Sequence, residues 1–278
     1  MIARNYSEVD VFSPTTYRGN PLAVVHDARG LDSDQMQRFA KWTNLAETTF
    51  LLPPSDPAAD YRVRIFSATH ELPFAGHPTL GSAAAWLGAG GVPRREGYLV
   101  QECGAGLVTV RVKDGRFAFA APPLTRYERA DEPLIHEIAR ALSIPRELIL
   151  DASWIVNGPE WIGIRLASAA EVLALAPDPA NLGSLCIGVV GPHEPGHEVD
   201  FEVRAFVGGD PVWEDPVTGS LNAGLARWLM DTGVAGTNYI AAQGTAIGYE
   251  GRVHVSVEAE DIWVAGEVTH CVNGQVTL

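Results

Sequence analysis

The sequence predicts an α+β fold built from two similar halves, because short alternating strands dominate it and several stretches repeat at one distance. Residues 62–66 and 202–206 both alternate polar and apolar side chains, which is typical of half-buried strands. Residues 78–82 and 216–220 share the pattern Pro-x-x-Gly-Ser, and each precedes an apolar run of helical length. These two elements are 138 residues apart, close to half of the 278-residue chain.

A second match at this distance supports a duplicated fold. Pro21 and Pro159 both precede strand-like runs and are also 138 residues apart. Two prolines interrupt the strand pattern at Ala121-Pro122-Pro123, where we place the boundary between the halves. The expected domains are residues 1–121 and 122–278, with the last strand free to pair with the first half.

The individual elements follow from periodicity. Alternating or apolar runs of strand length predict strands at residues 22–25, 62–66, 107–112, 161–164, 202–206 and 252–257. Runs with helical spacing predict helices at residues 33–44, 78–87, 133–142 and 220–230. Strands and helices do not alternate regularly, which argues against a Rossmann sheet. A curved sheet wrapped around one helix in each half would satisfy both patterns.

The composition restricts the partners and the location. The formal net charge is −14, from 34 acidic and 20 basic residues, so the surface would repel nucleic acid. No run of about 18 apolar residues predicts a membrane span, and the N-terminal residues lack the apolar core of a signal peptide. The three cysteines, which are Cys103, Cys186 and Cys271, are widely spaced and form no CxxC motif. Together these features favour a reducing, cytoplasmic location.

The two Pro-x-x-Gly-Ser elements are candidate ligand sites. A helix N-terminus offers backbone N–H groups and a positive dipole end, which suit an anionic group. Ser82 and Ser220 are either helix caps or side chains that contact such a ligand. His77 and Asp215 precede the two prolines, also 138 residues apart, so we expect them at the same place in the two halves. A histidine and a carboxylate opposite one another could hold a polar substrate or transfer protons.

Glu47 is the third candidate because it breaks the repeat. It follows a predicted helix and begins an apolar strand, and the residue 138 positions later is Leu185. The carboxyl group is either solvated at a strand edge or partly desolvated. A desolvated carboxyl group can act as a general acid and base.

Motifs of other enzyme classes are absent or incomplete. Residues 193–197 spell His-Glu-Pro-Gly-His, but proline and glycine cannot lie inside the helix that a zinc protease needs. The sequence contains no Walker A motif and no G-x-S-x-G motif. We therefore expect no metal site and no nucleotide cofactor.

Over nearly its whole length the sequence resembles the PhzF-like, or phenazine biosynthesis-like, family, which has the diaminopimelate epimerase fold. The segments that carry the resemblance are residues 19–25, 44–50, 74–82 and 214–220, followed by Gln243-Gly244. The resemblance implies two half-domains, each a mostly antiparallel, curved sheet wrapped around a central helix, with the active site between them. It also implies a homodimer without cofactors. It implies that Glu47 is the acid/base residue, with His77 and Asp215 as further catalytic residues. It also implies that Asn20, Gly76, Gly219 and Ser220 bind the substrate.

The resemblance further implies an isomerase that moves a proton within a small carboxylated metabolite. The family member with a known pathway acts on trans-2,3-dihydro-3-hydroxyanthranilate. Related epimerases and racemases use two cysteines, but neither Pro-x-x-Gly-Ser element contains one. Three alternatives remain: an amino-acid epimerase or racemase that uses a carboxylate, a binding protein that has lost turnover, and an acidic dimer with a structural role.

Overall fold

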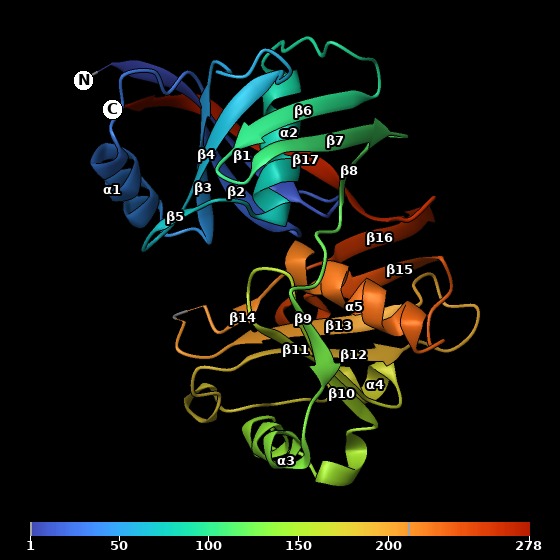
Figure 1. Ribbon diagram of the computed structural model, residues 1–278. Helices are drawn as coiled ribbons and strands as arrows, with labels where there is room; N and C mark the ends of the chain where they lie inside the picture. The colour runs from blue at the N-terminus through green and yellow to red at the C-terminus, as the bar shows by residue number, and fades with distance from the viewer. Residues whose placement is uncertain (1, 211) are drawn as a thin grey trace. The chain divides into compact units, whose positions relative to one another are not determined.

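The computed structural model describes residues 2–210 and 212–278 and confirms the α+β class (Figure 1). The chain forms two units. Unit 1 contains Met1–Ala120 and Ala265–Leu278, and unit 2 contains Ala121–Val264. Among the described residues, no helix has the length and apolar character needed to cross a membrane.

The strands of unit 1 pair into a closed ring. They are β1 (Ala3–Val11), β2 (Asn20–Val25), β3 (Glu47–Leu52), β4 (Tyr61–Ser67), β5 (Glu71–Leu72), β6 (Tyr98–Cys103), β7 (Gly106–Lys113), β8 (Arg116–Ala120) and the later part of β17 (Asp261–Thr277). The ring runs β1–β2–β3–β4–β6–β7–β8–β17 and returns to β1, while β5 adds a short pairing to β4. In the described part of the chain β2–β3 and β4–β6 are parallel, whereas β1–β2, β3–β4, β6–β7, β7–β8 and β1–β17 are antiparallel, so the sheet is mostly antiparallel.

Helix α2 (Gly76–Gly88) packs against β1, β2, β3 and β8, and Figure 1 shows the strands of unit 1 around it. Its first ten residues are all buried, as expected for a helix that is apolar on every side. Small residues allow the close packing: a Cβ atom at Gly81 would lie 2.5 Å from Leu22 Cδ2. Helix α1 (Ser33–Thr43) has a capping box of Asp32 and Gln35.

Unit 2 repeats the pairing pattern of unit 1. Its strands are β9 (Arg126–Arg129), β10 (Asp151–Val156), β11 (Trp161–Arg165), β12 (Cys186–Pro192), β13 (Phe201–Val207), β14 (Glu214–Asp215), β15 (Asn238–Gln243) and β16 (Gly251–Glu258). The order β10–β11–β12–β13–β15–β16 matches β1–β2–β3–β4–β6–β7, with parallel pairs at the same two places. The predicted pseudo-symmetry of the two halves is therefore confirmed.

Alternate residues of the unit 2 sheet face different helices. Helix α5 (Gly219–Asp231) packs on β10, β11 and β16, where a Cβ atom at Gly163 would lie 2.9 Å from Trp228. The intervening residues Ile162 and Ile164 join a core with α3 (Glu132–Ala141) and α4 (Ala169–Leu173). Short 3₁₀ turns at Arg146–Leu148, Pro179–Asn181 and Thr245–Ile247 complete the unit.

The structure corrects the predicted start of the first central helix. We expected the two central helices to begin at Pro78 and Ser220. Instead α2 begins at Gly76 and α5 at Gly219. Proline is tolerated in the first turn of a helix, so Pro78 does not mark the boundary. Ser82 consequently lies inside α2, where its buried hydroxyl donates to Thr49 Oγ1 at 3.0 Å. Neither Ser82 nor Ser220 is a helix cap.

Candidate active site

In unit 1 the structure brings Glu47 and His77 together. Glu47 is the first residue of β3 and His77 is the second residue of α2. Glu47 Oε2 lies 3.5 Å from His77 Nε2, and the two side chains are 18% and 7% exposed. A carboxyl group and an imidazole thus share a mostly buried place at the start of the central helix.

The imidazole of His77 is neutral. The backbone of Pro21 hydrogen-bonds to the ring, and because proline has no N–H group, its carbonyl accepts this bond from a ring N–H. Nε2 makes no hydrogen bond to the described residues, so Nδ1 is the nitrogen that donates to Pro21. Burial lowers the pKa of His77 from 6.5 to about 3, against the opposing effect of the Pro21 bond. The lone pair of Nε2 therefore points toward Glu47.

Asn20 and Gly76 lie next to this pair. Asn20 is the fully buried first residue of β2 and directly precedes Pro21, the residue that holds the His77 ring. Gly76 is the buried first residue of α2. The helix cap, Ala75, provides no side-chain hydrogen bond, and the first turn has no acidic residue. The helix start therefore retains its positive dipole end.

In unit 2 a hydrogen-bond network holds Asp215. Thr218 Oγ1 donates to Asp215 Oδ2 at 2.6 Å, and Gln243 Nε2 donates to the Asp215 carbonyl at 3.0 Å. Gln243 Oε1 accepts from the Thr218 N–H at 3.1 Å and from Asn222 at 2.8 Å. Because Gln243 is fully buried, this network fixes the segment from Asp215 to the start of α5.

Gly219 and Ser220 are the first two residues of α5. The cap residue Thr218 makes no side-chain capping bond, because its hydroxyl group is bound to Asp215. Ser220 Oγ accepts a hydrogen bond from Trp161 Nε1 at 3.0 Å, and the Ser220 carbonyl accepts one from Asn157 Nδ2 at 2.9 Å. This helix start also lacks acidic residues in its first turn.

The strand registers correct the expected equivalence of His77 and Asp215. β5 pairs with β4 as β14 pairs with β13, which makes Leu72 the counterpart of Asp215. The helix starts make His77 the counterpart of Ser220. The segment between β4 and β5 spans residues 68–70, whereas that between β13 and β14 spans 208–213, so a fixed distance of 138 fails here.

Glu47 has a structural counterpart that the fixed distance missed. Glu47 pairs with Ser67 at the start of β3, and Cys186 pairs with Val207 at the start of β12. Cys186 therefore takes the place of Glu47 in unit 2. Burial raises the pKa of the Cys186 thiol, with smaller contributions from Glu160 and Asp210, so the thiol is protonated at neutral pH.

Sequence reasoning did not identify the side chains that position Asp215 and Ser220. These are Asn157, Trp161 and Thr218, with Gln243 known only as part of the family pattern. Asn157 and Trp161 flank Pro159, and the match of Pro159 with Pro21 is the one sequence signal that pointed near them.

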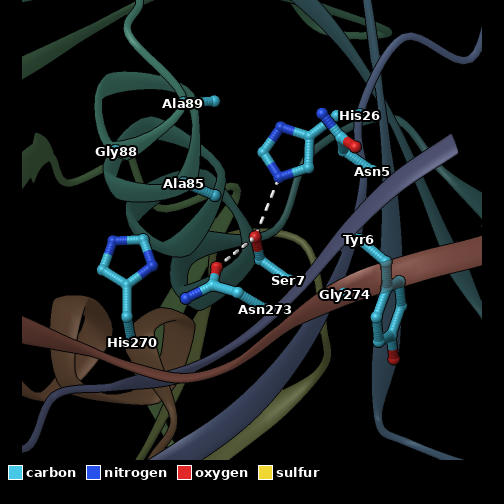
Figure 2. Close-up of a pocket in the computed structure, with 10 residues that line it drawn as sticks. All are labelled: Asn5, Tyr6, Ser7, His26, Ala85, Gly88, Ala89, His270, Asn273 and Gly274. Atoms are coloured by element: carbon cyan, nitrogen blue, oxygen red, sulfur yellow. Dashed lines mark hydrogen bonds between the residues drawn. The ribbon is translucent and has the colours of Figure 1, made fainter.

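A cavity of about 380 Å³ in unit 1 lies elsewhere, at the other end of α2 (Figure 2). Ala85 and Gly88 of α2 and the following Ala89 line it, together with residues of β1 and β17 and with His26. Ser7 Oγ lies 2.9 Å from His26 Nε2 and donates to Asn273 Oδ1 at 3.2 Å. None of the candidate site residues lines this cavity.

The rejected zinc motif forms a loop after β12. The rings of His193 and His197 stack with centroids 4.1 Å apart, and His193 Nε2 lies 3.1 Å from Glu202 Oε2. Within residues 2–210 and 212–278, no group of three or more His, Cys, Asp or Glu side chains could hold a metal ion.

The sequence and fold match known proteins over nearly the whole chain. Residues 9–274 match the family model PhzC-PhzF, described as phenazine biosynthesis-like protein. Antisense-enhancing sequence 1 of Schizosaccharomyces pombe is 35% identical over 295 residues, covering 99% of each protein. Trans-2,3-dihydro-3-hydroxyanthranilate isomerase of Pseudomonas aeruginosa is 32% identical, covering 91% of this chain and 90% of that enzyme.

The fold comparison agrees with the sequence comparison. The crystal structure of a PhzF-family phenazine biosynthesis protein from Enterococcus faecalis is 25% identical and superposes with a TM-score of 0.84. The match covers 100% of both chains. The fold is therefore the two-half arrangement expected of diaminopimelate epimerase-like proteins. The chain belongs to the phenazine biosynthesis-like (PhzC-PhzF) family and is an enzyme of the isomerase class.

Proposed function

We propose that this isomerase moves one proton between two carbon atoms of a small carboxylated metabolite, with Glu47 as general acid and base. The Glu47–His77 pair carries the proposal, because it holds a carboxyl group 3.5 Å from an imidazole nitrogen in a mostly buried place. Proton transfer at carbon needs such a group within reach of the substrate. The substrate named for the P. aeruginosa relative, trans-2,3-dihydro-3-hydroxyanthranilate, belongs to this class of compounds.

His77 assists by accepting a hydrogen bond and not the proton itself. The ionised Glu47 removes a proton from one carbon, and the electron pair of that C–H bond enters the π system of the substrate. The new O–H group of Glu47 then donates to the free lone pair of His77 Nε2. Because the pKa of His77 is about 3, the proton stays on Glu47. Glu47 returns it to a second carbon and the double bond shifts, with no net oxidation.

The helix starts provide the charge stabilisation that this step needs. Removal of the proton leaves negative charge on the substrate, and fixed N–H donors at Gly76 and Gly219 can stabilise it. Asn20 and Ser220 add polar side chains, while the carboxyl oxygens of Asp215 suit an amino or hydroxyl group of the substrate.

We also propose the assembly and setting of the enzyme. It is a cytoplasmic homodimer that works without a metal or organic cofactor and associates with neither nucleic acid nor membranes. The formal charge of −14 supports the exclusion of nucleic acid. The proton shift itself consumes no electrons, which is why it needs no redox cofactor.

Incubation with trans-2,3-dihydro-3-hydroxyanthranilate in D₂O tests the function. We expect the wild type to consume the compound and to incorporate deuterium, as followed by ultraviolet absorbance and mass spectrometry. Glu47→Gln keeps the shape of the side chain but removes the base, so incorporation falls by at least about 100-fold. Binding of the aromatic analogue 3-hydroxyanthranilate changes little, because glutamine still fills the place of Glu47.

The matched control is Glu71→Gln, which removes the same charge from the same unit at an exposed ion pair with Arg64. It should retain full incorporation. Undiminished incorporation in Glu47→Gln would refute the role of Glu47. A wild type that exchanges the α-proton of an amino acid instead would favour the epimerase alternative, and binding without exchange on any such compound would favour a silent binding protein.

A further inference from the structure

We propose that Trp161 is a positioning residue that fixes the Ser220 hydroxyl group as a hydrogen-bond donor toward the substrate. The inference deepens the proposed function and rests on it. Trp161 begins β11 and is 3% exposed, on the face of the sheet that packs against α5. Its indole Nε1 lies 3.0 Å from Ser220 Oγ.

The chemistry of the indole sets the direction of this bond. The indole nitrogen can only donate, so Ser220 Oγ must accept. The hydroxyl hydrogen of Ser220 then remains to be donated to another group. Ser220 is the second residue of α5 and half-buried, so its hydroxyl does not cap the helix. The ligand group that takes this hydrogen is an acceptor, such as a carboxylate, carbonyl or hydroxyl oxygen.

The backbone of Ser220 is held from the same hairpin. Asn157 follows β10, and its Nδ2 donates to the Ser220 carbonyl at 2.9 Å. Asn157 and Trp161 thus bind the main chain and the side chain of Ser220 from the two ends of one turn. With both fixed, the hydroxyl has little freedom other than the direction of its hydrogen.

The bond also makes the hydroxyl a stronger donor. In a chain of the form N–H to O–H to acceptor, each bond polarises the next, most strongly away from water. The effect grows when the acceptor carries negative charge, as the substrate does after Glu47 removes its proton. Loss of the indole N–H should therefore lower kcat more than it raises KM.

Unit 1 uses a different bond for the same task. The strand registers make Leu22 of β2 the counterpart of Trp161, and leucine cannot donate. There the neighbouring Pro21 holds the ring of His77, the counterpart of Ser220. In each half, the side chain of the second residue of the central helix is thus hydrogen-bonded to the adjacent strand. The bond involves a backbone carbonyl in unit 1 and an indole N–H in unit 2.

Kinetics of Trp161→Phe test the proposal with trans-2,3-dihydro-3-hydroxyanthranilate as substrate. We expect kcat/KM to fall by about threefold to tenfold, mainly through kcat, which is the effect of one neutral hydrogen bond. Trp154→Phe is the matched control, since Trp154 lies on the adjacent strand and its ring stacks under Arg126. It should leave kcat/KM unchanged.

The double variant shows whether Trp161 acts through Ser220. In the Ser220→Ala background, Trp161→Phe should cause no further loss, because the hydroxyl it orients is gone. An equal loss in both backgrounds would overturn the proposal.

A second measurement keeps Trp161 in place, so it decides the matter even where Trp161→Phe fails to fold. In ¹⁵N spectra of the full chain, the indole N–H signal of Trp161 should move in Ser220→Ala while that of Trp154 does not. An unmoved Trp161 signal refutes the hydrogen bond and the proposal with it. A wild type that neither converts the substrate nor binds 3-hydroxyanthranilate refutes the proposed substrate class instead, whatever the indole signal shows.

Discussion

His77 shows how one hydrogen bond and burial together define a residue's chemistry. The Pro21 carbonyl takes the Nδ1 hydrogen, and burial keeps the ring uncharged. A neutral ring with a bare Nε2 can hold a protonated Glu47 but cannot remove its proton. The pair therefore behaves as one carboxyl group with a fixed acceptor beside it.

The neutral state of His77 predicts a pH dependence of stability. The folded-state pKa is about 3, below the ordinary value of 6.5. As the pH falls below 6.5, His77 becomes protonated in the unfolded chain but stays neutral in the folded chain. The free energy of unfolding therefore decreases, by up to about 1.4 kcal/mol per pH unit, and this contribution is fully present only above pH 6.5.

His77→Asn removes the titrating group and isolates the effect. Urea unfolding at pH 7, 6 and 5 should show a shallower loss of stability in this variant than in the wild type. His136→Asn, at an exposed position of α3, should follow the wild-type slope. Parallel curves for His77→Asn and the wild type would mean that the imidazole of His77 is not buried in its neutral form.

At the scale of elements, each unit contains an Arg–Glu ion pair at the equivalent position. Arg204 forms two hydrogen bonds to Glu214, both 2.8 Å, and lies over the ring of Phe206. Arg64 is bound to Glu71 at 2.7 and 2.6 Å and lies over Phe66 in the same way. The pairs occupy matching registers and differ in exposure: 5% and 4% in unit 2, against 19% and 41% in unit 1.

The difference in exposure predicts different energetic costs for one substitution. Glu214→Gln leaves the buried Arg204 without its counter-ion and should lower the free energy of unfolding by about 3 kcal/mol. Glu71→Gln, in the exposed pair, should cost about 1 kcal/mol or less. Urea unfolding of the two variants at neutral pH measures both. Equal costs would show that the buried pair has no larger role than the exposed one.

The sequence largely predicted which segments are strands and helices. It did not predict which residues of the two units are structurally equivalent. The period of two in residues 62–66 and 202–206 identified β4 and β13, and the apolar run after Gly219 identified α5. The distance of 138 then misaligned the helices, because the connection before β14 is longer than that before β5. The periodicity of the strands does not depend on loop length, so the helix starts of the folded chain were needed to pair His77 with Ser220.

The candidate site was predictable in part for a similar reason. The family pattern named Glu47 and His77, and the structure places them 3.5 Å apart. Trp161 and Ser220 are 59 residues apart in sequence, and no local rule joins an indole to that hydroxyl. Contacts of this kind arise from tertiary packing and appear only in the folded chain.

At the scale of the whole molecule, β17 is the strand on which unit 1 depends. It pairs with β1 and with β8, so it closes the ring of strands. Deletion of Ala265–Leu278 would leave both neighbours with unpaired edges and expose the apolar α2. We expect this truncated chain to lose amide protection throughout unit 1 and to aggregate.

A shorter deletion provides the control. Removing residues 275–278 removes the pairing with Ala3, Arg4 and Asn5 and the two backbone hydrogen bonds between Leu278 and Ile2. The rest of the ladder from Tyr6 to Val11 remains. Hydrogen exchange followed by mass spectrometry should then show loss at the strand ends alone. Native protection in the longer truncation would mean that the ring closes without β17.

The same ladder brings the two ends of the polypeptide together. The Ile2 N–H donates to the Leu278 carbonyl at 2.6 Å, and the Leu278 N–H donates back to Ile2 at 3.1 Å. A linker of a few residues could therefore join them into a circle without disturbing a strand. The fold should therefore tolerate circular permutation. A permutant opened in an exposed loop would carry the same site in a different chain order.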